Sequence, residues 1–335
     1  MTTSSRAAAA SDVVPRRRHR LFQREVERVA ILGVWGLMIL AYGLVEPDLF
    51  LTSGTFQTIF NSQAALVFLS MALLCTFVIG EFLDLSVASV LGLSAMIVPV
   101  LTVLHGVNVV AASFVAVAVG LLCGLVNATL VVVVGVNPIV VTLGMSTLLT
   151  GVALWISDLN TVSGLSGSYA NLANATFLGL PLSFYYGLVI TLAFAYVLYL
   201  TPLGRHMKFL GANREVSRLA GVAVNRIRFG AFVFSGLISA VGGVVLVSSL
   251  RGFDPESSAV YLLPTFAAVF LGTAVVNPGE FNPIGAFVGV YFLETGIIGL
   301  QELGYGGWVS DVFYGAALVV AVTISTIVRR ATKKG

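Results

Sequence analysis

Long apolar stretches separated by short polar breaks run along almost the whole chain. Crossing the hydrocarbon core of a bilayer takes about 20 residues of α-helix, somewhat fewer or more with tilt. Apolar runs of that order occur ten times, so we predict an all-α membrane protein with about ten transmembrane helices. The predicted helices cover approximately Ala30–Val45, Thr58–Ile79, Leu85–Leu104, Val109–Val134, Ile139–Ile156, Phe184–Leu200, Phe229–Leu250, Leu262–Val276, Ile284–Leu300 and Val309–Val328.

The composition agrees with this prediction. Of the 335 residues, 58% are hydrophobic and 10% are charged, whereas a soluble domain is about a quarter charged. No Lys or Arg occurs in the 176 residues from Val29 to Gly204. The basic residues form three clusters, at Arg6–Arg28, Arg205–Arg228 and Arg329–Lys334, and only Arg251 lies outside them.

The basic clusters also predict the topology, because Lys and Arg near helix ends resist translocation and mark the cytoplasmic side. An even number of helices that starts inside also ends inside, and it places the middle cluster in a cytoplasmic loop after the sixth helix. We therefore predict that both termini are cytoplasmic. The net charge of +3 then reflects topology and contact with membrane lipid. It gives no support to nucleic-acid binding, which needs a basic face on a folded module.

The chain is predicted to form a single transmembrane domain, residues 29–328, between basic cytoplasmic tails at residues 1–28 and 329–335. The apolar run that begins at Ala30 lacks a small-residue cleavage pattern, so we expect a retained helix and not a signal peptide. The pairs Gly120/Gly124 and Gly285/Gly289 place small residues four apart, which lets helices approach closely in lipid.

The loop between the sixth and seventh predicted helices carries the most informative polar pattern. Asn213 is a favourable N-cap, Glu215 suits the positive first turn, and Gly221 is placed to end a short helix. Val216 and Leu219 share one face of that helix. These features fit a surface helix against lipid headgroups and a coupling helix that docks into a motor subunit equally well.

Three motifs, given at the end of this paragraph, resemble those of the permeases of ribose-type ABC sugar importers. These permeases belong to the branched-chain amino acid and ribose permease superfamily. The resemblance covers nearly the whole chain after the N-terminal tail. It departs in one extra residue before Asp84 and in the turn at residues 276–283, and both departures bear on substrate identity more than on fold. The motifs are Gly204-Arg205 with Gly211-Ala212-Asn213-Arg214-Glu215 and Ser217-Arg218-Leu219-Ala220-Gly221-Val222, Asp84-Leu85-Ser86-Val87-Ala88-Ser89, and Asn137-Pro138-Ile139-Val140-Val141-Thr142-Leu143-Gly144.

The resemblance implies a multi-pass permease of the bacterial inner membrane that passes a pentose, hexose or related polyol by alternating access. It also implies three partners: a cytoplasmic ATPase with two fused cassettes, an extracytoplasmic solute-binding protein, and a second permease copy in a homodimer. ATP and Mg²⁺ would bind to the ATPase, and we expect no cofactor in this chain. Coupling to the ATPase is expected at the matching positions Gly204, Arg205, Gly211, Asn213, Arg214, Glu215, Val216, Arg218, Leu219 and Gly221.

Polar residues in or beside the predicted helices are candidates for the solute pathway or its gate. A carboxylate near bilayer depth usually faces a bundle interior or a wet cavity, which favours a gating role for Glu81 and Asp84. Capping of the third helix by Asp84 fits equally well. Neutral residues such as Asn61 and Thr147 fit a pathway lining or interhelical hydrogen bonds. The candidate set is Glu81, Asp84, Ser86, Asn127, Asn137, Pro138, Thr142 and Glu294.

We predict that Asn137 caps the fifth helix and that Pro138 is its first residue. The alternative is that these residues contact the solute. Glu294 is the deepest acidic residue of the last helices, and no Lys or Arg is near it in sequence. A proton-coupled secondary transporter of a small polar solute is therefore the alternative function.

Catalytic signatures are absent from the sequence, which contains no G-x-x-x-x-G-K-[ST] loop, H-E-x-x-H or G-x-S-x-G motif. His19, His105 and His206 are far apart, which argues against a metal site. We therefore predict no catalytic residue and no metal. The function that we predict is a permease subunit powered by a separate ATPase.

Overall fold

The computed structural model describes residues 31–275 and 279–333, and most of its elements are α-helices. The first helix is Ile31–Val45. It is followed by α2 (Pro47–Phe50), α3 (Ser53–Ser62), α4 (Ala64–Phe77), α5 (Val87–Pro99), η1 (Val100–Leu104), α6 (Val109–Ala128), η2 (Thr129–Val134), α7 (Pro138–Ile156), β1 (Val162–Ser163), α8 (Gly167–Asn174), β2 (Thr176–Phe177), β3 (Leu180–Pro181), α9 (Leu182–Leu200), α10 (Pro202–Ala212), α11 (Arg214–Leu219), α12 (Val224–Leu250), β4 (Gly252–Phe253), η3 (Ser257–Tyr261), α13 (Leu262–Gly272), α14 (Pro283–Glu302) and α15 (Trp308–Lys333).

Seven helices of this described part are long and apolar enough to cross a membrane. They are Ser53–Phe77, Val87–Leu104, Val109–Val134, Pro138–Ile156, Leu182–Leu200, Val224–Leu250 and Pro283–Glu302. Three shorter apolar helices, Ile31–Val45, Ser257–Gly272 and Trp308–Thr323, lie where the other three spans are predicted. A mainly helical fold with several membrane-spanning helices is therefore confirmed. The count of ten and the side of each terminus stay predictions.

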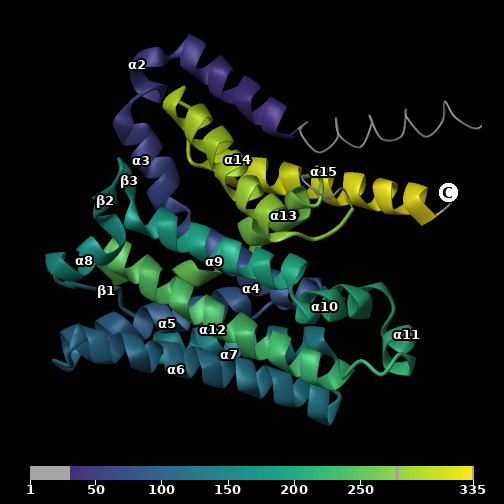
Figure 1. The fold of residues 1–335 in the computed structure, drawn as a ribbon. Helices are drawn as coiled ribbons and strands as arrows, with labels where there is room; N and C mark the ends of the chain where they lie inside the picture. Colours follow the sequence, from purple (N-terminus) through teal and green to yellow (C-terminus); the bar gives the residue numbers. More distant parts are fainter. Residues whose placement is uncertain (1–30, 276–278, 334–335) are drawn as a thin grey trace, which may run out of the picture.

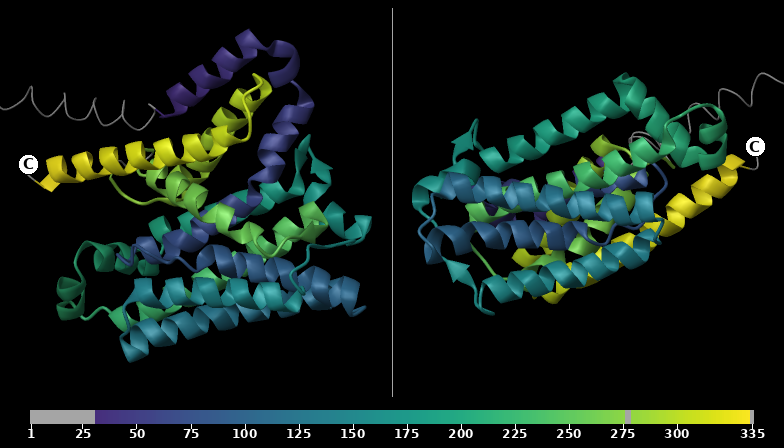
Figure 2. Two further views of the ribbon diagram at one scale, coloured as in Figure 1. Left: turned by 180° about the vertical axis from the view of Figure 1, so that it is seen from behind. Right: turned by 90° about the horizontal axis from the view of Figure 1, so that it is seen from below.

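The helices form two groups, and α4 contacts both of them. α12 packs against α4, α5 and α6 in a layer that also contains α7 and α9 (Figure 1). In the second group α13 packs against α14 and α15, and the first helix joins it through Tyr42, whose hydroxyl donates to the Gly296 carbonyl at 3.2 Å. The strands and α8 lie at one end of the molecule, and α10 and α11 lie at the other, as the views in Figure 2 also show.

Both predicted small-residue pairs lie at close helix contacts. A Cβ atom added to Gly236 of α12 would lie 2.6 Å from the Gly120 carbonyl oxygen and 2.8 Å from the Gly124 Cα atom of α6. On α14, a Cβ on Gly289 would lie 2.6 Å from the Ala268 carbonyl oxygen of α13. Without a hydrophobic force between helices in lipid, such backbone-to-backbone packing is a main source of association.

Burial divides the layer into core and periphery. The most apolar windows of Ser53–Phe77 and Val87–Leu104 are 82% and 78% buried, whereas that of Pro138–Ile156 is 22% buried. The helices α6, α7 and α9 therefore present their apolar side chains outward, as membrane-facing helices do.

The end of the molecule opposite α11 is held by short strands and a polar cluster. β1 pairs with β4 and β2 with β3, both antiparallel. Asn61 of α3 donates to the Asn174 Oδ1 atom of α8 at 3.0 Å and accepts from the Ser183 hydroxyl of α9 at 2.8 Å. Of the two interpretations of Asn61, the structure therefore shows the interhelical hydrogen bonds.

Candidate functional site

The short capped helix predicted in the middle basic loop is α11. Its Asn213 Oδ1 atom accepts from the Val216 amide at 3.1 Å, and Gly221 has a φ of +80°, a conformation that ends helices and favours glycine. Leu219 is 82% exposed and Val216 is 47% exposed. The helix therefore presents an apolar face, made of Leu219 and about half of Val216, that the described part of the chain leaves exposed.

A second helix, α10, precedes it and is not among the predicted elements. The Thr201 hydroxyl accepts from the Gly204 amide at 3.3 Å and Pro202 occupies the first turn. This Thr-Pro pair is a start signal that could have revealed the helix. Gly204 packs against the backbone of Val197 and Leu198, and Gly211 packs against the Val78 carbonyl. The two motif glycines thus fix α10 to the ends of α9 and α4.

Glu81, a predicted gate residue, lies in an ion-pair cluster beside α11. Its side chain is 7% exposed, and its Oε1 atom accepts from the Arg228 Nε atom at 2.6 Å and also from the Arg214 guanidinium. Two guanidinium groups compensate the cost of burying this carboxylate. The sequence marks Arg228 only as part of a cytoplasmic cluster, because its partner is 147 residues away.

Asp84, three residues further on, is the centre of a buried hydrogen-bond network. Its Oδ1 atom accepts from the Ser86 amide at 3.1 Å and the Ser86 hydroxyl at 2.7 Å, and its Oδ2 atom accepts from the Ser235 hydroxyl at 2.9 Å. The Asn127 amide group donates to the Ser86 hydroxyl at 2.8 Å. The predicted hydrogen bond from the Ser86 amide to Asp84 is present, but the N-cap residue of α5 is Ser86 and not Asp84, and α5 has no side-chain cap hydrogen bond. Ser235 is absent from the predicted set because it lies within an apolar run.

Burial raises the pKa of Asp84 above its ordinary value, although the hydrogen bonds from Ser86 and Ser235 act in the opposite direction. The folded protein therefore holds this proton more tightly than the unfolded chain does. As the pH rises from the unfolded pKa through the folded one, Asp84 loses its proton and lowers stability.

We expect Asp84→Asn to remove this loss. The melting temperature of the variant in detergent should rise relative to that of the native protein as the pH is taken from 4 to 8. Both proteins share every other titrating group, so the difference between the two curves isolates Asp84. A difference that stays constant, or that falls with pH, would contradict the assignment.

Thr142, another candidate, contacts the segment next to this network. Its hydroxyl donates to the Leu83 carbonyl at 3.3 Å, which joins α7 to the segment between Glu81 and Asp84. Asn137 caps α7 by accepting from the Ile139 amide at 2.9 Å, with Pro138 at the first position, as the preferred interpretation predicts.

Glu294 lies elsewhere, between α14 and α15. Its Oε2 atom accepts from the Tyr314 hydroxyl at 3.2 Å. It therefore does not join the network around Asp84. Within the described residues no group of His, Cys, Asp and Glu could hold a metal ion, and His19 lies outside them.

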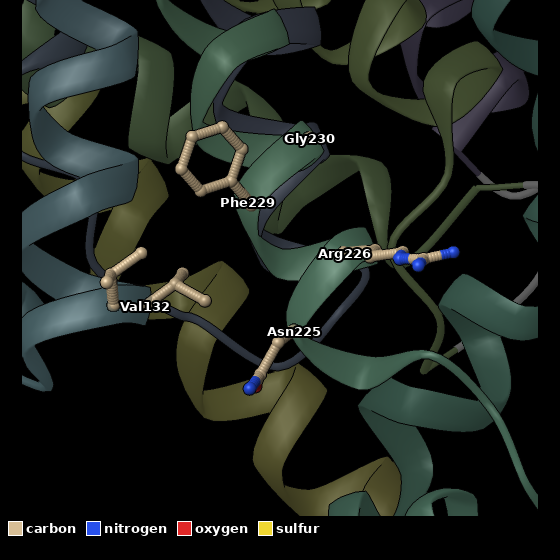
Figure 3. Close-up of a pocket in the computed structure, with 6 residues that line it drawn as sticks. Val132, Asn225, Arg226, Phe229 and Gly230 are labelled. Carbon is tan, nitrogen blue, oxygen red and sulfur yellow. The ribbon is translucent and has the colours of Figure 1, made fainter.

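A hollow of about 600 Å³ opens between η2 and the start of α12, and it contains none of the predicted pathway residues. Figure 3 shows Val132 and Phe229 facing one another across it, with Asn225 at its edge and the Arg226 guanidinium directed away from Phe229. Its lining is mainly apolar, which suits contact with lipid or protein more than with a polar solute.

The fold and these sites define a class: a polytopic helical membrane protein with an exposed capped helix at one end and buried polar networks beside it. The chain matches the family described as branched-chain amino acid transport system, permease component, over residues 55–322, and it belongs to that family. The predicted permease function and multi-pass inner-membrane location are thereby confirmed.

Individual relatives agree with the family. The chain is 31% identical to the autoinducer 2 import system permease protein LsrD of Salmonella typhi over 301 residues, 88% of this chain and 90% of the relative. It is also 31% identical, with the same coverage, to the LsrD protein of Escherichia coli strain K12 / DH10B. No solved structure matches the chain. The resemblance to sugar-type ABC importer permeases is confirmed by these relatives, and membership of such importers implies an ATPase and a binding protein as partners.

Proposed function

We propose that this permease passes a small, neutral, hydroxyl-rich solute, either a sugar or a sugar-like molecule such as autoinducer 2. The relatives named above import autoinducer 2. The side chains of Ser86, Asn127, Thr142 and Asn137 supply uncharged donors and acceptors on α5, α6 and α7, and the Oδ1 atom of Asn127 is buried without a partner in the described part of the chain. Neutral polar groups of this kind suit hydroxyl groups better than charged solutes.

The observation that carries the mechanism is the exposed apolar face of α11. A transport subunit without a nucleotide site must receive work through an interface, and a short rigid helix can dock into a groove of the motor. We assign this role to α10 and α11, with two fused ATPase cassettes that bind ATP and Mg²⁺ on the partner. ATP binding would move the docked helices and change the access of the pathway.

The proposal includes the topology predicted from charge. Ten spans with both termini in the cytoplasm place α10, α11 and the middle basic cluster on one side and the strands with α8 on the other. The separation of these elements to opposite ends in Figure 1 supports that arrangement. The proposed domain from 29 to 328 continues without a break into the basic tail, because α15 extends to Lys333.

A second copy of the chain would complete the pathway along α7. This helix exposes Gly144, Thr147 and Gly151, and a Cβ atom added to either glycine meets no other atom within 4 Å. Small and hydroxyl-bearing residues on one helix face are typical of helix interfaces in lipid. The carboxyl groups of Asp84 and Glu294 then lie inside each protomer and not at the interface.

Oxidation of a Thr147→Cys variant in membranes is expected to give a disulfide-linked dimer, measured as a doubled mass on non-reducing gels. Leu192→Cys on α9, also exposed, is the matched control and should stay monomeric. The native Cys75 and Cys123 are buried and do not interfere. Equal cross-linking at both positions, or at neither, would reject α7 as the interface.

Substrate class is tested by uptake into proteoliposomes that contain the permease, its ATPase and its binding protein. We expect ATP-dependent uptake of labelled autoinducer 2 or of a pentose or hexose, with competition among neutral hydroxyl-rich compounds. Uptake of leucine with no uptake of any sugar-like compound would overturn the substrate proposal and leave the permease assignment intact.

A further inference from the structure

The connection between α4 and α5, residues 78–86, makes side-chain contacts with several other helices. It joins two buried helices, yet residues 81–84 adopt no regular structure. Each end carries a buried carboxylate, Glu81 at 7% exposure and Asp84 at 2%. An irregular segment between rigid helices that is held at both ends can transmit a displacement from one end to the other.

The end of this connection that contains Val78 and Glu81 contacts the proposed docking helices, α10 and α11. Arg214 is the first residue of α11, and its guanidinium pairs with Glu81. Gly211, at the end of α10, packs against the Val78 carbonyl, where a Cβ atom would not fit. Movement of α11 would therefore pull on Glu81 directly. Arg228, which is 12% exposed on α12, donates to the same Oε1 atom of Glu81.

The end that contains Leu83 and Asp84 is hydrogen-bonded to the helices that carry the pathway candidates. Asp84 is bonded to Ser235 of α12 and to Ser86, which in turn is bonded to Asn127 of α6. The Leu83 carbonyl accepts from Thr142 of α7 at 3.3 Å. A few residues of chain thus separate the ion pair with α11 from the hydrogen bond to α7.

Two further contacts link the connection between α4 and α5, and the helix α10, to the segment that precedes α14. The Phe82 ring lies 6.0 Å from the Phe281 ring, and Lys208 of α10 pairs with Glu280 at 3.5 Å. The Lys208 pair is largely solvent-exposed and contributes little to stability. The ring contact joins the two connections.

We propose that Glu81 is a positioning residue that transmits the displacement of α11 through residues 81–84 to Thr142 and α7. This inference rests on the proposed docking of an ATPase at α11. It assigns Glu81 to coupling and not to contact with the solute. The path runs from α11 through Arg214, Glu81 and the Leu83 carbonyl to Thr142, and each step is a direct contact or a covalent link within the chain.

The two arginines distinguish this role from a purely structural one. Arg214 is 45% exposed and Arg228 is 12% exposed. If Glu81 served only stability, loss of the buried Arg228 would matter most, and loss of the half-exposed Arg214 would matter little. If Glu81 transmits movement, loss of Arg214 matters as well, because it breaks the ion pair that links α11 to the connection.

The test measures solute imported per ATP hydrolysed by the permease–ATPase complex in proteoliposomes with the binding protein. We expect Glu81→Gln and Arg214→Gln each to lower this ratio by about 2- to 30-fold, the range of coupling energies along such networks. The double variant should be no worse than the stronger single one, because both break the same link. Glu81→Asp keeps the charge and should recover part of the ratio.

The possible results distinguish failure of the role of Glu81 from failure of the proposed transport function. An unchanged ratio in Glu81→Gln, or additive losses in the double variant, would overturn the role of Glu81. If Glu81→Gln does not fold, as judged by thermal unfolding in detergent, Arg214→Gln decides the question, because its partly exposed side chain contributes less to stability. If the native complex shows no ATP-driven uptake, the proposed function fails instead, and the role of Glu81 fails with it.

Discussion

Replacing Val216 and Leu219 together by Asp is expected to abolish association of the permease with its ATPase. The two side chains form the exposed apolar face of α11, with Leu219 at 82% exposure. Burying a Val or Leu side chain contributes about 1.5–3 kcal/mol each, so losing both weakens the interface by about 100-fold or more. Two unpaired carboxylates in the docking groove add a desolvation cost. Capture of the ATPase on the tagged permease from detergent-solubilised membranes measures the effect.

The matched control changes an equally exposed apolar pair at the opposite end of the molecule. Phe177 and Leu178, at the turn between β2 and β3, are 58% and 82% exposed. Their replacement by Asp should leave ATPase capture at the native level. If the α11 variant still captures the ATPase while inserting normally in the membrane, α11 is a surface helix against headgroups and not the docking element.

Replacing Gly236 by Leu is expected to lower the stability of the fold strongly. Its missing side chain is what allows α12 to lie against the backbone of α6, with atoms of Gly120 and Gly124 within 2.8 Å of the place that a Cβ atom would occupy. Those atoms are backbone and cannot rotate away, so the helices must separate. Overpacking of this kind costs about 1–3 kcal/mol or more, a large part of a typical stability of about 5–15 kcal/mol. The yield of monodisperse protein and its melting temperature in detergent measure the loss.

Gly230→Leu, in the same helix, is the control for this substitution. A Cβ atom on Gly230 meets nothing within 4 Å, and the residue borders the hollow shown in Figure 3. The variant should give native yield and melting temperature. Equal loss in both variants would mean that leucine is harmful anywhere in α12 and that the close contact with α6 is not what matters.

The sequence predicts local features of this protein well, because each depends on neighbouring residues. Apolar runs locate the helices, with Val109–Val134 predicted to the residue. Capping chemistry identifies α11 from Asn213 and Gly221, and α7 from Asn137 and Pro138. The helix α10 escapes the prediction although its cap, Thr201, follows the same chemistry. Its start signal, Thr201 followed by Pro202, comes directly after the apolar run that ends at Leu200, with no polar break between the two helices.

The contacts that define the site could not be predicted in the same way. Glu81 and Arg228 are 147 residues apart, and Asp84 and Ser235 are 151 apart. Any of the 18 basic residues could in principle have paired with Glu81, and a single serine in an apolar helix has no signature of its own. Only the packing of α12 against α4, α5 and α6 brings these partners together. The sequence therefore indicates that Glu81 and Asp84 matter, while the fold separates them into an ion pair and a hydrogen-bond network.

A measurement of solute uptake under two driving forces distinguishes an ATP-driven permease from a proton-coupled one. Proteoliposomes with the permease alone and with the permease–ATPase complex are compared under two driving forces, ATP on the α11 side and an imposed pH gradient. We expect uptake only from the complex with ATP and the binding protein, and none from the pH gradient. Uptake by the permease alone along a pH gradient, lost in Glu294→Gln, would contradict an ATP-driven mechanism and establish a proton-coupled transporter.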